Sequence, residues 1–324
     1  MTKWTIYASM CYNIGSVRKN NEDAYYFNGH FAPFSEMDQG AFLIQNVNAE
    51  DSLWAVCDGM GGQNNGEAAS YMAASSMKEL QERLRGRSFE ATVQNWVWQA
   101  SRAINEKTDG GGSTMVMLYC ADGCLQTASI GDSRIYRFHN GQLIRITKDH
   151  SKVEMMLDAK MITPEEARTH PQKNVITRYL GMDSEYPCVA AIGRQIPLVR
   201  GDRYLLCSDG VTDMLTDEMI STLMAKHEDV KTCMEKIRDA IFVAGARDNL
   251  TAILLELEAE DEPGIVSLND GFSDYEEPDD EPTLDAEDSI PEAQIRMDVS
   301  WSKDSRCEFI MHGMPEKLSL SFRR

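Results

Sequence analysis

The sequence predicts an α+β fold for its first 257 residues, with antiparallel sheets and helices packed on their outer faces. Five short apolar runs bounded by polar turns have the length and composition of buried strands: residues 53–57, 115–119, 125–130, 204–207 and 252–257. Three longer stretches carry apolar residues at three- and four-residue spacing, as amphipathic helices do: 66–85, 89–104 and 230–243. Because the helices follow pairs of strands, a strictly alternating parallel fold is disfavoured.

The composition is that of an ordinary globular protein. The chain has 324 residues, of which 42% are hydrophobic and 26% are charged. No run approaches the ~18–20 apolar residues of a membrane-spanning helix. The first residues lack the charged and then apolar pattern of a signal peptide. The net charge of −20 disfavours nucleic acid, which needs a basic surface. We therefore expect a cytoplasmic protein with no membrane or nucleic-acid partner.

The eight cysteines are spread along the chain and contain no CxxC pair. Most lie inside apolar runs, and the six histidines do not stand beside cysteines at the spacing of zinc ligands. We therefore expect reduced thiols that pack in the core, without disulfides or a zinc site.

The negative charge is concentrated in one segment. Residues 256–292 contain sixteen aspartates and glutamates and no lysine or arginine, which leaves a net charge of −4 for the rest of the chain. The segment also contains four prolines and few large apolar residues, a composition typical of disordered chains. We predict one folded domain over 1–257, a boundary near residue 257, and an acidic disordered linker over 258–292.

The last 32 residues, 293–324, differ again from the linker. Apolar residues alternate with polar ones at 295–301 and at 318–322, which predicts two short, half-buried strands. A β-rich segment of this size cannot bury enough surface to be stable alone. We therefore expect it to dock on the rest of the chain or on a partner.

Acidic residues recur where the predicted strands begin or end. They are Glu22, Asp23, Asp58, Asp132, Asp209 and Asp248. Carboxylates held at one edge of a sheet repel each other, which costs stability unless cations lie among them. Hard divalent cations prefer oxygen ligands, and a glycine after Asp58 allows the Gly59 carbonyl to approach such an ion. A single Asp-Gly pair is most often a turn, but the repeated pattern predicts a divalent-cation site.

A set of short motifs resembles the PPM family of metal-dependent Ser/Thr protein phosphatases, in the family's order and over residues 1–257. The motifs are RKNNED at 18–23, DGMGG at 58–62, GST at 112–114, GDSRIY at 131–136, TKDHS at 147–151, SDG at 208–210 and DN at 248–249. The length of the chain and the methionine in DGMGG are similar to bacterial members. The resemblance implies a four-layer αββα sandwich, in which two antiparallel sheets are flanked by helix pairs.

The resemblance also implies which residues hold the cations, two Mn2+ or Mg2+ ions. Asp58 would bridge the two ions, and Gly59 would contribute its carbonyl oxygen. Asp209 and Asp248 would complete the coordination of the first ion, and Glu22 would lie near the second. Two ions about 3.5–4 Å apart acidify a bridging water and neutralise phosphoryl oxygens, so the water attacks the phosphate directly.

The resemblance also implies roles for residues near these ligands. Asp23 would orient a bound water, and Asp132 would help Asp209 to hold a weaker third ion. Arg18 would bind the substrate phosphate, for which the planar guanidinium is suited. Some family members have a histidine, proposed as the general acid, where this chain has Met60, and methionine cannot donate a proton. The proton would then come from water, with the third ion as one source.

The resemblance implies hydrolysis of phosphoserine and phosphothreonine in proteins, by a monomer whose partners are phosphoproteins, a Ser/Thr kinase and its substrates. Two other functions stay open: a metal-free regulatory module, and a hydrolase of small phosphate esters. The intact acidic motifs favour the phosphatase. His150 is more often structural than catalytic. Residues 151–188, which follow it, correspond in position to the family's flap, and Lys160 stands there where bacterial relatives often have glycine.

Overall fold

The computed structural model describes residues 3–61, 65–182, 188–260, 296–301, 306–312 and 319–323. It divides the chain into two compact units, Met1–Gly264 and Ile265–Arg324. Among the described residues, no helix is both long and apolar enough to cross a membrane.

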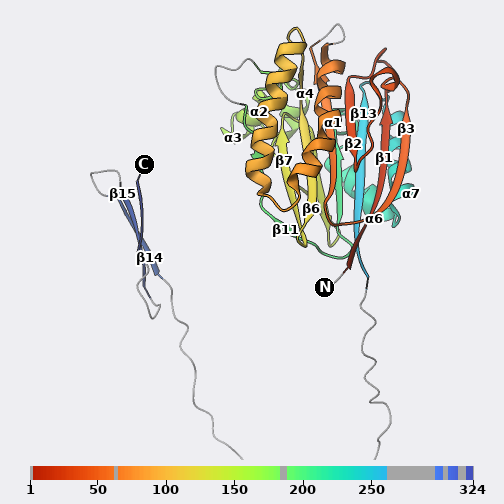
Figure 1. Ribbon diagram of the computed structural model, residues 1–324. Coiled ribbons are helices and arrows are strands. Elements are labelled where there is room, and N and C mark those ends of the chain that lie inside the picture. Colours follow the sequence, from red (N-terminus) through yellow and green to blue (C-terminus); the bar gives the residue numbers. More distant parts are fainter. Residues whose placement is uncertain are drawn as a thin grey trace, which may run out of the picture. The chain divides into compact units, whose positions relative to one another are not determined.

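The first unit contains a six-stranded antiparallel sheet, here called sheet A (Figure 1). Its order is β3 (Ala41–Asn48), β1 (Lys3–Asn13), β13 (Leu250–Glu260), β12 (Arg203–Cys207), β8 (Arg134–His139) and β9 (Gln142–Arg145). The centre of the sheet thus joins the beginning and the end of the unit, because β1 pairs with β13 along its whole length.

A second antiparallel sheet, sheet B, lies against sheet A. Its order is β10 (Ala191–Ile192), β7 (Cys124–Ile130), β6 (Met115–Ala121), β4 (Ser52–Met60) and β2 (Asp23–Phe27), with β11 (Ile196–Pro197) on β7 and β5 (Gly112–Ser113) on β4. Trp54 and Val56 of β4 pack between the sheets, whereas Leu53, Ala55 and Cys57 pack against helices. This burial on both faces explains why the run at 53–57 is continuously apolar.

Helices cover the outer face of each sheet. Sheet B packs on α1 (Asn65–Leu84) and α2 (Phe89–Lys107), and sheet A on α5 (Asp209–Thr212), α6 (Asp217–Lys226) and α7 (Val230–Val243). Shorter helices complete the unit: η1 (Phe34–Glu36), α3 (Lys152–Asp158) and α4 (Pro164–Thr169). Ser88 and Asp229 cap α2 and α7 by accepting backbone amide hydrogen bonds. The expected four-layer αββα sandwich is confirmed.

The second unit contains a three-stranded antiparallel sheet of β14 (Arg296–Trp301), β15 (Arg306–His312) and β16 (Ser319–Arg323). The two expected strands correspond to β14 and β16, and the central strand β15 was not predicted. Strand β13 runs to Glu260, three residues beyond the expected boundary. The predicted linker from residue 261 onward lies outside the described residues, so its disorder stays a prediction.

Candidate active site

Acidic residues from separate segments meet at one end of the sandwich. Strands β2 and β4 are antiparallel neighbours, and their register places Asp23 directly opposite Asp58. Asp209 is the first residue of α5, directly after β12 and Ser208. Asp248 lies just before β13, and Asp132 lies in the turn between β7 and β8. The charges of the other four aspartates act on Asp58, so the five aspartates lie near one another, whereas Glu22 is not among the described residues whose charges raise the pKa of Asp58.

The carboxylates of this cluster oppose one another's ionisation. Burial raises the pKa of Asp58 well above its usual range, and the charges of its four acidic neighbours raise it further. Burial raises the pKa of Asp132 to about 8, with Asp209 as the next cause. Burial and then Asp248 raise the pKa of Asp209 to about 6. Such mutual repulsion destabilises a fold unless cations or protons compensate the charge.

Arg18 reaches this cluster from the loop between β1 and β2. Its Nη2 donates to Oδ2 of Asp248 at 2.7 Å, and its Nη1 lies 4.0 Å from Oε2 of Glu22. The Arg18 side chain is 46% exposed, so part of the guanidinium still faces solvent. The hydrogen bond to Asp248 raises the pKa of Arg18. The predicted phosphate-binding arginine therefore lies beside two of the predicted cation ligands.

Asp23, which lies opposite Asp58 in this cluster, is only 1% exposed. Its Oδ2 accepts hydrogen bonds from Ser208 Oγ at 2.8 Å and from Thr251 Oγ1 at 2.7 Å. Burial raises the pKa of Asp23 to about 7, although these two hydrogen bonds act in the opposite direction. The carboxylate thus links β2 to the end of β12 and the start of β13. Its expected role in orienting a water stays a prediction.

The glycine after Asp58 fills a position where no side chain fits. A Cβ on Gly59 would lie 2.2 Å from the carbonyl oxygen of Gly66 and 2.5 Å from that of Glu22. The Gly59 amide also donates to the Glu22 carbonyl at 2.9 Å. Glycine therefore allows close packing of the end of β4 against the start of α1, and the approach of its carbonyl to a cation stays a prediction.

Thr114 holds the backbone of Asp58 from the other side. Its Oγ1 accepts from the Asp58 amide at 2.9 Å, and its own amide donates to the Asp58 carbonyl at 2.8 Å. The same hydroxyl shares a hydrogen bond of 2.7 Å with Ser133 Oγ. Sequence reasoning assigned no role to Thr114, Ser133, Ser208 or Thr251. Their position beside or within the acidic motifs was the available signal.

A family model described as Protein phosphatase 2C matches residues 35–254. The chain belongs to the protein phosphatase 2C family. This result confirms the resemblance to bacterial metal-dependent Ser/Thr protein phosphatases, and it accounts for the order of the acidic motifs along the fold.

Individual relatives of this phosphatase 2C chain are bacterial. Serine/threonine protein phosphatase PstP of Mycobacterium tuberculosis is 32% identical over 249 residues, which are 75% of this chain but 43% of that protein. The chain thus matches less than half of the length of that relative. Serine/threonine phosphatase stp of Listeria monocytogenes is 30% identical over 256 residues, 75% of this chain and 92% of that protein.

A solved structure shares the fold of this phosphatase 2C unit. The catalytic domain of PstP in complex with two manganese ions has a TM-score of 0.63 and 29% sequence identity. The match covers 79% of this chain and 99% of that chain.

His150 has a structural place in this phosphatase 2C fold. Its Nδ1 accepts from the Gly131 amide at 3.1 Å, and its own amide donates to the Gly131 carbonyl at 2.8 Å. Burial, together with the charge of Arg178, lowers the pKa of His150. The imidazole therefore ties down the turn that precedes Asp132, in agreement with the structural interpretation favoured from the sequence.

The flap of this phosphatase 2C chain keeps a left-handed backbone at Lys160, with a φ of 55°. A glycine adopts this conformation readily, whereas a residue with a Cβ is strained in it. Lys160 therefore forms the turn after α3 at a cost in local strain.

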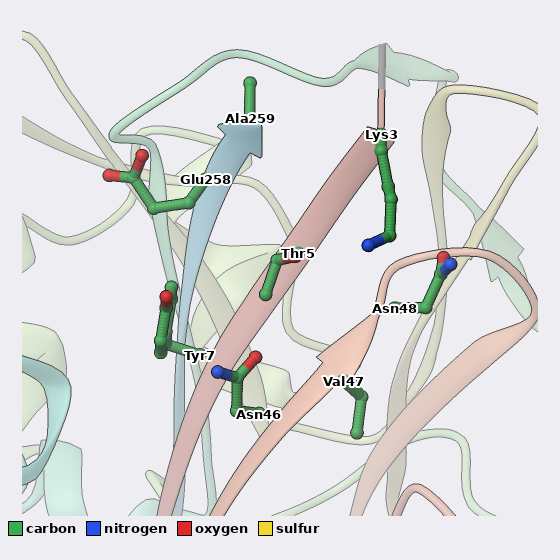
Figure 2. Close-up of a pocket in the computed structure, with 8 residues that line it drawn as sticks. All are labelled: Lys3, Thr5, Tyr7, Asn46, Val47, Asn48, Glu258 and Ala259. Atoms are coloured by element: carbon green, nitrogen blue, oxygen red, sulfur yellow. The ribbon is translucent and has the colours of Figure 1, made fainter. Parts of the chain in front are cut away.

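The surface cavity shown in Figure 2 is not the site of the acidic cluster. It has a volume of about 570 Å³ and is lined from three neighbouring strands of sheet A: by Lys3, Thr5 and Tyr7 of β1, Asn46, Val47 and Asn48 of β3, and Glu258 and Ala259 of β13. These residues lie at the start of β1 and the end of β13, whereas Asp248 precedes the start of β13. The cavity therefore lies at the opposite end of these strands.

The donor set at the acidic end fits hard divalent cations. Its side chains offer carboxylate oxygens, which Mg2+ and Mn2+ prefer. Within the described residues, no three His, Cys, Asp or Glu side chains are already arranged around one ion position. Part of the charge is instead compensated by Arg18, which donates to Asp248. A cation at Asp248 would replace this contact.

Proposed function

We propose that the chain is a metal-dependent phosphatase that hydrolyses phosphoserine and phosphothreonine in proteins. One observation carries the proposal: five aspartates from distant segments lie together at one end of a phosphatase 2C sandwich, where Asp23 is directly opposite Asp58 and the charges of the other four raise the pKa of Asp58 after burial. A structural role alone does not explain why a fold would retain such repulsion.

The residues that would hold the cations follow from the cluster. Asp58 would contact both ions, and the Gly59 carbonyl would approach one of them. Asp209 and Asp248 would complete the coordination of the first ion. Glu22 would lie near the second. The two manganese ions in the structure of the PstP catalytic domain support Mn2+ or Mg2+ in this role. When bound, the cations supply an acidified water and neutralise phosphoryl oxygens.

The other residues of the chain would bind and orient. Arg18 would turn from Asp248 to the substrate phosphate, to which its guanidinium can donate two parallel hydrogen bonds. Thr114 holds the backbone of Asp58 in register, and Asp23 would orient the water while the hydroxyls of Ser208 and Thr251 fix its carboxylate. This rigid support keeps the donors in place as charge develops on the phosphoryl group.

The proton for the leaving group does not come from Met60, which carries none to donate. We propose that Asp132, with Asp209, helps to hold a weaker third ion whose water serves as this source. Asp132→Ala should then lower turnover while it leaves binding of the first two ions intact. Full turnover and unchanged metal dependence in this variant would contradict the third-ion proposal.

The test of the function is phosphate release from a phosphothreonine peptide by the purified full chain. Release should require Mn2+ or Mg2+ and should stop when EDTA is added. Absence of metal-dependent release would contradict the proposal and favour a regulatory module. A higher kcat/KM for small phosphate esters than for phosphopeptides would instead favour a small-ester hydrolase.

Phosphorylated proteins are the proposed partners, together with a Ser/Thr kinase and its substrates, and the cytoplasm is the proposed compartment. The seven cysteines between residues 11 and 233 have free thiols, which supports a reducing compartment. Removal of residues 265–324 would test the second unit. Activity on small esters should persist, because β13 and the acidic cluster remain, whereas a loss on protein substrates alone would assign substrate delivery to that unit.

A further inference from the structure

The DN motif at 248–249 contains a residue to which the cation site gives no role. Asn249 follows the predicted ligand Asp248 and is 4% exposed. Its side chain does not turn toward the carboxylates. It points into the loop over residues 14–22, which joins β1 to β2 and carries Arg18 and Glu22.

The side-chain amide of Asn249 makes three hydrogen bonds to this loop. Its Nδ2 donates to the carbonyls of Ile14 and Asn20, both at 3.0 Å, and its Oδ1 accepts from the Glu22 amide at 2.8 Å. An asparagine side chain has two N–H donors and one carbonyl acceptor, and all of them are engaged here. One buried side chain therefore closes both ends of a nine-residue loop.

Other contacts place the same loop against the segment before β13. The Ser16 amide donates to the Ala246 carbonyl at 2.7 Å. A Cβ on Gly15 would lie 2.2 Å from the carbonyl oxygen of Asp248, so the two backbones are in close contact. The Arg18 side chain then spans from the middle of the loop to Asp248. The loop is thus built on residues 246–249, with Asn249 as its buried anchor.

We infer that Asn249 is a positioning residue, which sets the place of Arg18 for phosphate binding without touching the substrate. The inference rests on the proposed function. A half-exposed arginine on a loop without regular structure binds phosphate well only when its backbone is held in advance. Loss of the Asn249 amide leaves three backbone groups without their partner and frees both ends of the loop.

A double-mutant cycle of Asn249→Ala with Arg18→Ala tests this inference. Asn249→Ala should raise KM for a phosphothreonine peptide about tenfold and change kcat less. In the Arg18→Ala background, the same substitution should change KM by less than about twofold, because the group that Asn249 positions is absent. If the two increases in KM instead multiplied in the double variant, Asn249 would act independently of Arg18, and the inference would be overturned.

Asn249→Asp and Asn13→Ala sharpen the cycle. Aspartate keeps the acceptor for the Glu22 amide but lacks both donors, so Asn249→Asp should resemble Asn249→Ala. Asn13, the last residue of β1, accepts from the Gly15 amide of this loop at 2.9 Å, and among the described residues its side chain forms no hydrogen bond with Asn249. Asn13→Ala should therefore leave KM within about twofold of the wild type. A tenfold increase in the KM of Asn13→Ala would show that other loop contacts matter as much as those of Asn249, and it would overturn the inference.

Hydrogen exchange provides a readout independent of activity. In Asn249→Ala, amides of residues 14–22 should exchange faster, while those of β4 and β12 keep their protection. Unchanged exchange in the loop, or faster exchange throughout the unit, would overturn the inference. A wild-type chain without phosphatase activity would contradict the proposed function and the role of Arg18 with it. An active wild type with multiplying effects would contradict the positioning role of Asn249 alone.

Discussion

The aspartates just before and just after β12 have opposite electrostatic surroundings. Asp202, just before the strand, is 2% exposed and accepts from Arg137 Nε at 2.7 Å, with His139 Nδ1 at 2.5 Å from its other oxygen. Asp209, just after the strand, is half-buried, and burial and then the charge of Asp248 raise its pKa. Lys173, whose charge lowers the pKa of Asp209, forms its ion pair with Asp213.

This contrast distinguishes a carboxylate that stabilises the fold through an ion pair from carboxylates that are available to bind a cation. At the Asp202 end, Arg137 of the same chain supplies the compensating positive charge, and the ion pair joins β8 to the start of β12. At the Asp209 end, the carboxylates outnumber the cations, so a compensating charge must come from outside the chain. The unpaired carboxylates, rather than the buried carboxylates as such, therefore indicate the candidate active site.

The largest expected effect comes from replacing Asp209 with asparagine. Asp209→Asn should lower metal-dependent phosphate release by about 10³-fold or more, because it removes a ligand of the cation that activates water. The metal-free variant should be at least as thermally stable as the wild type, since one repulsive charge is gone. Steady-state kinetics and thermal unfolding with EDTA would measure both effects.

Asp202→Asn is the matched control at the other end of β12. Removing one partner of a buried ion pair typically costs about 3–5 kcal/mol of unfolding free energy. Denaturant unfolding should show this loss, while Mn2+ binding to the folded variant should be kept. If Asp202→Asn abolished Mn2+ binding, or Asp209→Asn destabilised the metal-free chain by a similar amount, the contrast between the two ends would be wrong.

The next effect concerns Arg18, which bonds directly to the acidic cluster. Arg18→Ala should raise KM for a phosphopeptide about 10–100-fold, the range for loss of a charge-assisted hydrogen bond. Its Mn2+ affinity should rise, because Arg18 no longer competes for Asp248. Kinetics and calorimetric titration would measure the two quantities.

Arg178 offers a matched arginine for this experiment. It is exposed, and its Nη1 lies 3.3 Å from the Val189 carbonyl oxygen and 3.5 Å from His150 Nε2. Arg178→Ala should change KM much less than Arg18→Ala. A reversed order of the two effects would move the phosphate-binding role to the flap.

A smaller effect should appear in the dependence of stability on pH. Free aspartate has a pKa near 3.8, whereas in the folded chain it is about 6 for Asp209, 7 for Asp23 and 8 for Asp132. Between these limits the folded chain binds more protons than the unfolded chain. The stability of the metal-free protein should therefore fall as pH rises from about 4 to about 8.

Divalent cations should reverse this trend, because they bind the ionised carboxylates that repel each other. The increase in Tm on adding Mn2+ should be larger at about pH 8 than at about pH 5, where protons compete for the same oxygens. Thermal scans with Mn2+ or EDTA at both pH values would measure it. An equal increase at both would show that the cluster does not bind the cation.

The smallest expected effect lies in the flap, away from both ends of β12. Lys160→Gly should stabilise the chain by about 0.5–1 kcal/mol, because glycine relieves the left-handed strain but loses more entropy on folding. Chemical denaturation would detect the change. Metal affinity should not move, so a shift in Mn2+ binding would connect the flap to the acidic cluster.

The success of the sequence-based predictions depended on how each segment is buried. The predicted helix at 230–243 coincides with α7, because its one-sided burial imposes a clear three-four spacing. The run at 53–57 was predicted as a strand because β4 is buried on both faces. Strands β1 and β3 were not predicted: β1 mixes polar and apolar residues, and β3 is partly exposed at the edge of sheet A.

The acidic motifs were recognisable from the sequence, but the contacts that organise them were not. Nothing in the local pattern around Asn249 shows that its amide bonds Ile14, which lies 235 residues away along the chain. Nor does the sequence show that Asp23 accepts from Ser208 and Thr251, since these bonds depend on the neighbouring positions of β2, β12 and β13.

The amino-acid pattern was therefore sufficient for the fold class, the family and the set of acidic residues, because each is recorded in short stretches of chain. Only the packed sandwich decided which carboxylates are paired and which are left to repel one another. The physical reason is that electrostatic compensation depends on distances between strands. Residues as close in sequence as Asp202 and Asp209 can have different neighbours at the two ends of one strand.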